Sequence, residues 1–261
     1  GSKQISIVGV SPQETAIDCG LSYDSDCPNE SCGHYNTVGL PAFSVPRRGI
    51  LFTGRSALSH VSLGNCMATA WSSAIPTTFG HLDTVGGCSS FLGDSHLEYV
   101  DFHDCHANDG GGAGVLQRAW LRNVTFGSCT GTGGSAVEIR DGGHVDWEGG
   151  DAQYNFVIGG HGRADHLWGG TLLIFHGSAT VRNVAFSNSY SSESDYGAAV
   201  FSFLPLNISN CTFMDNEGPA GVSDIFFTAN TEGESRPLML RDNFFDRTGG
   251  VVVGLPRSSQ G

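Results

Sequence analysis

The chain has 261 residues, of which 39% are hydrophobic, 15% are charged and 38 are glycine, and its net charge at pH 7 is −13. This hydrophobic content is sufficient for a folded core and excludes a disordered polymer, and the sequence contains no apolar run of the roughly 18 residues that a membrane-spanning helix needs. Because nucleic acid and anionic membranes attract basic surfaces, we expect a glycan or a protein surface as the partner, with no nucleic acid and no membrane insertion.

The N-terminal fifty residues have the least regular pattern. Residues 1–2 (GS) are typical of a cloning remnant, and we expect a single domain over residues 3–254. The segment QISIVGV, residues 4–10, predicts a first strand. Residues 11–48, which contain Cys19, Cys27 and Cys32, break the pattern. They predict an irregular loop or cap, since the open strand edge at the end of a repeat array needs cover.

A short phrase then returns along the chain: LRNVTF at 121–126, VRNVAF at 181–186, ISNCTF at 208–213 and LRDNFF at 240–245. We take the last large residue of each phrase as an anchor. The intervals between anchors run from 21 to 39 residues, and we interpret each 39-residue interval as two turns. A period in the low twenties with short strands predicts a solenoid. The anchors are Leu63, Phe102, Phe126, Trp147, Phe186, Phe213 and Phe245.

The residue types within each period indicate which solenoid this is. V-x-F triplets such as VTF and VAF alternate with glycine-rich phrases such as GGAGVL and GAAVFSF. Short β-rich stretches separated by Gly, Asn and Asp indicate an all-β parallel β-helix, in which glycine occupies corners that need positive φ. The spacing predicts about ten coils.

Asn, Asp and His recur three residues before the anchors, and we expect them to stack at a corner and to bond the neighbouring coil. Two of the four N-x-S/T sequons, at Asn123 and Asn210, fall in this column, where an inward amide could not carry a glycan. The sequons at Asn29 and Asn207 lie outside it. Asn29 and Asn207 are therefore the predicted glycosylation sites of a secreted glycoprotein.

The eight cysteines are an even number, which suits an oxidising compartment. Cysteine recurs three residues after the anchors, and neighbouring coils about 4.8 Å apart are within the reach of a disulfide. Stacked thiols that pack as small apolar groups are an equally good interpretation. The candidates for disulfides are Cys66, Cys88 (in a degenerate copy of the phrase), Cys105 and Cys129, together with Cys19, Cys27 and Cys32.

The opening ISIVGVSPQETAIDCG, the phrase GGAGV at 111–115 and FMDN at 213–216 resemble the repeats of the chlamydial polymorphic outer membrane proteins. More broadly, the chain resembles the pectate-lyase-like superfamily of right-handed parallel β-helices. The resemblance covers nearly the whole chain. It implies a right-handed β-helix and a surface adhesin, and it implies that any enzymatic site of a lyase or epimerase would lie on an outer face.

The densest polar stretch is EYVDFHDCHANDGGG, residues 98–112. Strand alternation turns Asp101 and His103 outward, and two coils on we expect Asp146 and Glu148 at the equivalent positions, about 10 Å away. Such groups could bind Ca²⁺ through oxygen or act as acid and base on a sugar; a solvated turn is the simpler alternative. The catalytic candidates are Tyr99, Asp101, His103, Asp104, His106 and Asp146, and the metal candidates are Asp101, Asp104, Asp109, Asp146 and Glu148.

A second polar patch surrounds Trp168, whose indole either belongs to the core or forms a platform for a sugar. Residues 255–261 predict a disordered tail. The sequence as a whole favours an extracellular or cell-surface module for binding or adhesion. The alternatives are a cation-dependent polysaccharide lyase or epimerase, and a structural component of a wall or matrix. The binding candidates in the second patch are His161, Arg163, Asp165 and His166.

Overall fold

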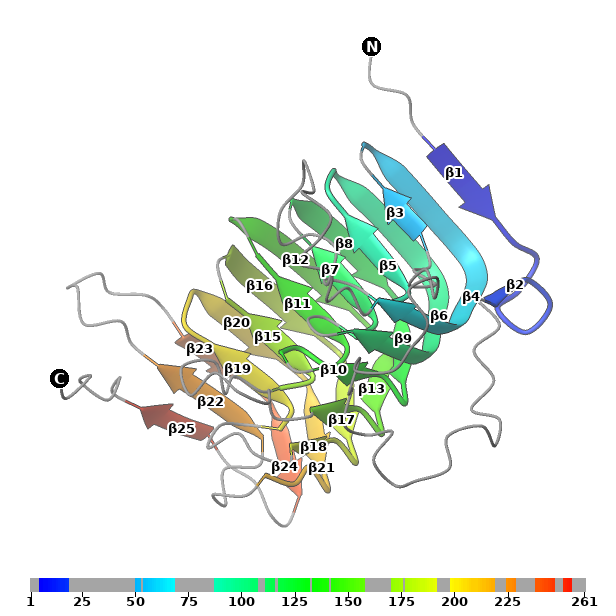
Figure 1. Ribbon diagram of the computed structural model, residues 1–261. Helices are drawn as coiled ribbons and strands as arrows, with labels where there is room; N and C mark the ends of the chain where they lie inside the picture. The colour runs from blue at the N-terminus through cyan, green and yellow to red at the C-terminus, as the bar shows by residue number, and fades with distance from the viewer. Residues whose placement is uncertain are drawn as a thin grey trace, which may run out of the picture.

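A computed structural model of the protein describes residues 5–18, 50–52, 54–68, 87–107, 111–115, 117–131, 133–140, 142–157, 170–175, 177–191, 198–218, 224–228, 238–246 and 251–254. These residues form β-strands and connecting turns, and none of them belongs to a helix, so no helix described here could cross a membrane. All strand pairs are parallel and lie in a 17-stranded sheet and an 8-stranded sheet (Figure 1). The expected all-β class with parallel strands is confirmed.

The larger sheet consists of β1 (Ile5–Val8), β2 (Ala16–Asp18), β4 (Ser56–Ala68), β6 (Ser95–Ala107), β8 (Arg118–Arg122), β9 (Thr125–Gly127), β10 (Thr130–Gly131), β12 (Gly143–Glu148), β13 (Asp151–Gln153), β14 (Phe156–Val157), β16 (Gly177–Arg182), β17 (Ala185–Ser187), β18 (Tyr190–Ser191), β20 (Leu206–Ser209), β21 (Thr212–Met214), β23 (Leu238–Arg241) and β24 (Phe244–Asp246). The smaller sheet consists of β3 (Ile50–Phe52), β5 (Ser89–Phe91), β7 (Ala113–Val115), β11 (Val137–Ile139), β15 (Leu172–Ile174), β19 (Val200–Ser202), β22 (Ile225–Thr228) and β25 (Val251–Gly254).

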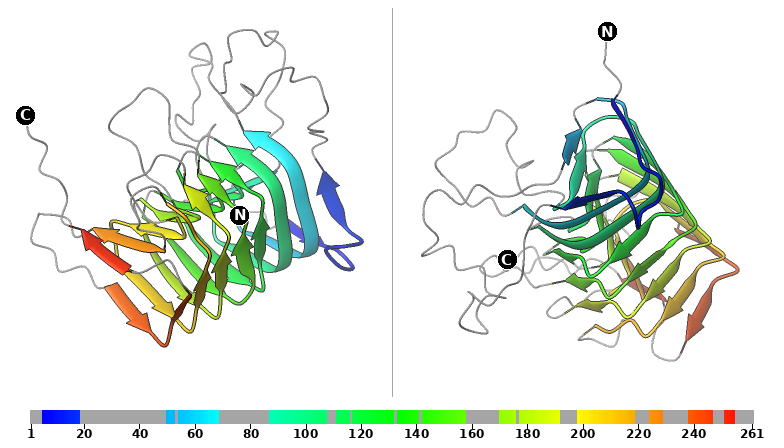
Figure 2. Two further views of the ribbon diagram at one scale, coloured as in Figure 1. Left: turned by 90° about the horizontal axis from the view of Figure 1, so that it is seen from below. Right: turned by 90° about the vertical axis from the view of Figure 1, so that its right-hand side faces the viewer.

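Successive turns of the chain stack on one another, as the views in Figure 2 show. The long strands β4 and β6 pair in register over their whole length and bend around two corners, whereas later turns divide the same path into three short strands, such as β8, β9 and β10. Leu63 pairs directly with Phe102. The 39 residues between them are therefore one turn and not the two that we expected, and the count of about ten coils is not confirmed.

Side chains from the two sheets meet in one core, and the anchors form a column within it. The rings of Phe102 and Phe126 stack at 4.8 Å, and those of Phe186 and Phe213 stack at 5.2 Å. All four side chains are fully buried. Offset stacking of parallel rings adds stabilisation to the burial of apolar area, so the repeated Phe both forms the core and aligns the turns.

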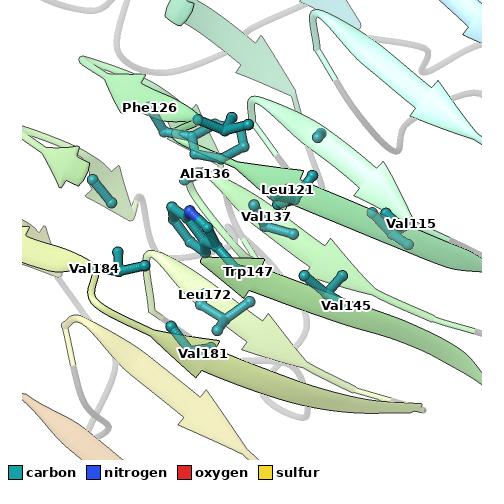
Figure 3. Packing of buried hydrophobic residues seen from close by; sticks show 14 of the residues in the cluster. Val115, Leu121, Phe126, Ala136, Val137, Val145, Trp147, Leu172, Val181 and Val184 are labelled. Atoms are coloured by element: carbon teal, nitrogen blue, oxygen red, sulfur yellow. The ribbon is translucent and has the colours of Figure 1, made fainter. Parts of the chain in front are cut away.

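Trp147 departs from the anchor column. It pairs with Leu121 and Val181, while Ala152 pairs with Phe126 and takes the place expected for Trp147. The VDW triplet therefore precedes its corner and is offset by five residues. Figure 3 shows the Trp147 indole in the core near Phe126. Its ring meets Phe126 edge to face at 5.3 Å. The large indole thus fills the space that the small Ala152 leaves.

Corners are held by residues with φ between 50° and 57°, a conformation that Asn and Asp adopt more easily than most residues. Among the described residues, which do not include Asp165, the predicted corner column is confirmed except at His144, which lies within β12, where Gly149 turns the chain instead. The corner residues are His60, Tyr99, Asn123, Asn183, Asn210 and Asp242, and a second corner has Asn65, Asp104, Ser128, Tyr154, Asn188 and Asp215.

The corner side chains face outward, contrary to our expectation. Asn123 and Asn210 are exposed, so the reason for excluding their sequons was wrong, while the predicted acceptor Asn207 is half-buried on β20. The inward amides lie elsewhere. Asn155 Nδ2 donates to Phe126 O at 3.0 Å, and its Oδ1 accepts from Cys129 N at 3.0 Å. Asn216 and Asn243 make the same kind of bonds with earlier turns.

One disulfide joins the two sheets. Cys88 lies just before β5 in the smaller sheet and not in the cysteine column, and it bonds Cys105 of β6 with a Cα–Cα distance of 5.4 Å. Cys66, beside Cys105 in the ladder, is also disulfide-bonded. Cys129 is a buried free thiol, so it was wrongly placed among the disulfide candidates. Complete burial raises the pKa of Cys129 to about 12.

Several expectations concern residues outside the described ranges. They are the cysteines Cys19, Cys27 and Cys32, the sequon at Asn29, the remnant at 1–2 and the tail at 255–261. The predicted cap at 11–48 is described only to residue 18. There Ala16–Asp18 pairs with Ser62–Gly64 as strand β2, so this part of the cap is regular.

Candidate functional site

The polar stretch follows β6 from residue 98 to residue 107 and passes around both bends of the strand. Tyr99 and Asp104 hold its two corners, and Asp101 and His103 point outward between them, as we expected. His106 is buried, and burial lowers its pKa. Of the remaining candidates, Asp109 and the patch of His161, Arg163, Asp165 and His166 lie outside the described residues.

Asp101 and His103 have distinct surroundings. Partial burial raises the pKa of Asp101, an effect that the nearby His103 and a hydrogen bond with Ser62 only partly offset. His103 Nδ1 lies 3.1 Å from Asp104 Oδ2. The imidazole packs over Gly64, where a Cβ would come within 2.0 Å of the ring, while the space beside Gly127 in the next turn is open. A small side chain in the preceding turn is thus required for this histidine position.

Asp146 and Glu148 do not occupy the outward positions equivalent to Asp101 and His103 two turns on, contrary to our expectation. Asp101 pairs with Thr125, and the next residue in that column is Asp151, because Ala152 follows it opposite Phe126. Partial burial and the charge of Asp101 both raise the pKa of Asp151, whose Oδ1 has no hydrogen-bond partner. The two related carboxyl groups on this face are therefore Asp101 and Asp151, and the same five-residue offset that moved Trp147 explains the error.

Asp146 lies instead around the corner, on the outer face of β12. Arg118 Nη2 donates to Asp146 Oδ2 at 2.7 Å, and His144 Nε2 lies 3.1 Å from Oδ1. Partial burial raises the pKa of Asp146, but the hydrogen bonds from Arg118 and His144 outweigh it and leave the pKa below its usual value. His144 in turn bonds Ser178 at 2.6 Å. Asp146 is an ionised, fully engaged carboxylate, which is unsuitable as a proton donor.

Trp120 lies one turn earlier and pairs with Asp146 in the ladder. Other side chains cover both faces of its indole ring. His96 stacks on it with ring centroids 4.3 Å apart and planes 5° apart, and the Arg118 guanidinium lies 4.5 Å from its centroid. A cation over an indole is stabilising. Because both faces of the ring are occupied, a ligand can touch the edge of Trp120 but cannot stack upon it.

A column of alternating charge runs beside Trp120 and Asp146. Glu98 pairs in register with Arg122, Arg122 with Glu148, and Glu148 with Arg182. The guanidinium nitrogens of Arg122 and Arg182 lie 3.7 and 3.9 Å from Glu148 Oε2. Exposed pairs of this kind contribute little to stability, so their main effect is to place donors and acceptors at regular intervals on the surface.

These two columns border a shallow groove on the outer face of β8, β12 and β16, which we call the Trp120 groove. Sequence reasoning found Asp146 and Glu148 but missed the rest of the lining. Aligning HLEY, WLRN, DWEG and TVRN, which begin at residues 96, 120, 146 and 180, would have revealed it, because they share one inward and two outward positions. The groove is lined by Trp120, Leu121, Arg122, Asp146, Glu148 and Arg182.

The predicted metal ligands are not gathered at one place. Among the described residues, no group of three His, Cys, Asp or Glu side chains is arranged to hold a metal ion. Asp101 and Asp104 lie on one bend of β6, whereas Asp146 and Glu148 lie around the corner with arginine partners. In the Trp120 groove, the guanidinium groups of arginine neutralise the carboxylates that we had expected to bind a metal ion.

No family model, no curated protein and no solved structure matches the chain. The likeness to β-helix repeats therefore depends on the sequence motifs, with which the parallel stacked strands are compatible.

Proposed function

We propose that the protein is a right-handed parallel β-helix that serves as an extracellular or cell-surface binding module, and that the Trp120 groove holds an extended glycan. The observation that carries this proposal is the pair of polar columns on β8, β12 and β16, which present arginine and carboxylate groups beside Trp120 along one groove. Parallel strands repeat about every 4.8 Å, so the groove offers similar contacts at successive positions of a polymer.

The local charge of the groove supports a neutral or mildly polar sugar chain. Arg122 and Arg182 balance Asp146 and Glu148, so the strongly acidic charge of the whole chain is not concentrated here. Hydroxyl groups of a glycan can both donate to the carboxylates and accept from the guanidinium groups. Since the faces of Trp120 are covered, binding depends on these hydrogen bonds and not on stacking.

The disulfide between Cys88 and Cys105 supports secretion, because disulfides persist in oxidising compartments. A protein surface is the alternative partner for the same groove, which is shallow enough to admit one.

A glycan array followed by calorimetry tests the proposal. The double variant Arg122→Ala/Arg182→Ala should weaken binding by about tenfold or more, since charged hydrogen bonds contribute about 1.5–3 kcal/mol each. The matched control is Arg241→Ala, which removes an exposed arginine of the same column in the last turn, outside the groove. Equal affinity of both variants, or the absence of any glycan hit beside a protein partner, would overturn the glycan assignment.

A carbohydrate-active enzyme is the second candidate, and the raised pKa values of Asp101 and Asp151 favour it. Two carboxyl groups with raised pKa values on one face, with His103 beside Asp101, are suited to proton transfer on a sugar. In this reading the protein is a cation-dependent polysaccharide lyase or epimerase, and Asp101 and Asp104 are the nearest candidates for Ca²⁺.

The enzyme candidate predicts turnover of acidic polysaccharides in the presence of Ca²⁺, followed by ultraviolet absorption of unsaturated uronate or by NMR for an epimerised product. Asp101→Asn should reduce the rate by at least about a hundredfold, as expected for loss of an acid or base. The control Asp94→Asn changes a partly exposed carboxylate in the turn before β6. An unchanged rate in Asp101→Asn, or no turnover of any substrate, would eliminate this candidate.

A further inference from the structure

The stack ends in strands that are paired on one side only. Among the described strands, β1 and β2 pair with β4 alone, at one end. At the other end, β23, β24 and β25 pair only with β20, β21 and β22. These two ends lie at opposite extremes of the stack in Figure 1. Each therefore presents backbone N–H and C=O groups that an additional parallel strand could pair with.

The last turn also exposes apolar side chains. Phe244 is 58% exposed, Met239 is 53% exposed and Leu240 is 37% exposed. Leu240 belongs to the inward column in which Ile208 is completely buried one turn earlier. Phe245 stacks on Phe213 at 4.9 Å through one face of its ring and is only partly buried. The core thus continues to the end of the stack, and none of the described residues forms a polar cap over these side chains.

The first turn has residues of the same columns, but smaller ones. Ile7 occupies the column of Leu240, since it pairs with Leu58, and Ile17 occupies the column of Phe245, since it pairs with Leu63. Both are only partly buried. Outward positions hold Ala16 in the column of Phe244 and Ser6 in the column of Met239. Large side chains at one end therefore match small ones at the other.

We infer that the last turn docks the first turn of a second copy of this chain, so that molecules stack head to tail. In this register Leu240 meets Ile7 and Phe245 meets Ile17, and both apolar columns continue across the junction. All ladders between the described strands are parallel, and a head-to-tail junction keeps that sense, whereas two like ends would have to pair antiparallel. The contact joins two different surfaces, so it is open and can repeat.

The longer connection between β1 and β2 does not disturb this register. Gly9 N donates to Ser59 O at 2.8 Å and Ser62 N donates to Thr15 O at 2.8 Å. The chain therefore leaves the ladder at Gly9 and rejoins it at Thr15, at a corner where the last turn has only Asp242 and Asn243. One position opposes the junction, because Asp246 shares its column with Asp18. Burial of the two apolar columns has to outweigh that repulsion.

Sedimentation equilibrium of the purified chain tests the inference. The weight-average mass should rise with concentration from one copy toward two and more. Phe244→Lys should abolish this rise, because it puts a charge at the junction without touching the core. The matched control Tyr154→Lys replaces an exposed aromatic residue in the middle of the stack and should leave the rise unchanged. A constant monomer mass in the wild-type chain, or an unchanged rise in Phe244→Lys, would overturn the inference.

Cysteine cross-linking then identifies which ends meet. Val8 and Arg241 belong to one outward column, so they become neighbours only in a head-to-tail pair. Under mild oxidation, a mixture of Val8→Cys and Arg241→Cys should form a disulfide-linked heterodimer, while either variant alone should form no disulfide-linked dimer. A dimer of Val8→Cys alone or of Arg241→Cys alone would show pairing of like ends and would refute the head-to-tail register. This outcome is independent of glycan binding at the Trp120 groove.

Discussion

Asp224, just before β22, has a carboxyl group that is almost entirely out of contact with water, with 1% of the residue exposed. Asn216 Nδ2 donates to its Oδ1 at 3.0 Å, while its Oδ2 has no hydrogen-bond partner. Burial raises the pKa of Asp224, which the bond from Asn216 only partly offsets. The folded protein consequently binds a proton at Asp224 more tightly than the unfolded chain does.

This asymmetry predicts how stability varies with pH. The contribution of Asp224 is fully present below the unfolded pKa and is lost as pH rises through the higher folded pKa. Asp224→Asn keeps an acceptor for Asn216 and removes the charge. It should therefore raise the free energy of unfolding at pH 7 by on the order of 1 kcal/mol and give little gain near pH 4.

Urea denaturation at both pH values measures the difference. Asp215→Asn, at an exposed corner nine residues earlier, is the control and should change stability equally little at both. A loss of stability in Asp224→Asn at pH 7 would contradict the account of an uncompensated carboxyl group.

At the scale of the strand, β12 has its large aromatic residue, Trp147, before the corner and the small Ala152 after it, where the preceding turn has Leu121 and Phe126. This exchange of large and small residues explains both a success and a failure of the sequence analysis. The inward columns at Phe102, Phe126, Phe186 and Phe213 could be predicted, because a triplet of Val or Cys, a variable residue and Phe recurs directly after a corner Tyr or Asn. The turn of β12 could not, because a strand on either side of a corner has the same alternation of apolar and polar residues. Only the space left by Ala152 decides that VDW belongs before the corner, and sequence spacing does not contain that information.

The exchange predicts strong coupling between the two positions. Trp147→Leu alone leaves a cavity and Ala152→Phe alone overfills the core, so each should cost roughly 2–4 kcal/mol. The double variant Trp147→Leu/Ala152→Phe recreates the Leu121 and Phe126 pattern of the preceding turn. It should recover most of the loss, to within about 1 kcal/mol of the wild-type chain. Urea melts of the four proteins measure the coupling, and additive losses would disprove the exchange.

For the whole molecule, the same five-residue offset determines what the surface can do. It separates Asp146 and Glu148 from Asp101, which divides the single acidic site expected from the sequence into two faces. One face has Asp101 and Asp151, two turns apart and with raised pKa values, and the other has carboxylates neutralised by arginine. The all-β class with parallel strands and most inward residues followed from periodicity. The neighbours of each outward residue depended on the register between turns, which the unequal lengths of the turns obscure in the sequence.

Head-to-tail stacking would unite the binding proposal with the expectation of a wall or matrix component. Each added copy would extend the outer faces in the same direction, so weak contacts at successive Trp120 grooves could act together along one polymer.

The pairing of Leu63 with Phe102 across 39 residues carries a consequence for how such a chain changes over time. Adjacent turns are joined through the residues of their paired strands, so the length of peptide that connects one strand to the next does not alter the pairing. Whole stretches of sequence between β4 and β5 can therefore be gained, lost or exchanged in a single genetic event while the stack stays intact. Natural variation and deliberate grafting of new peptides should both be tolerated best there.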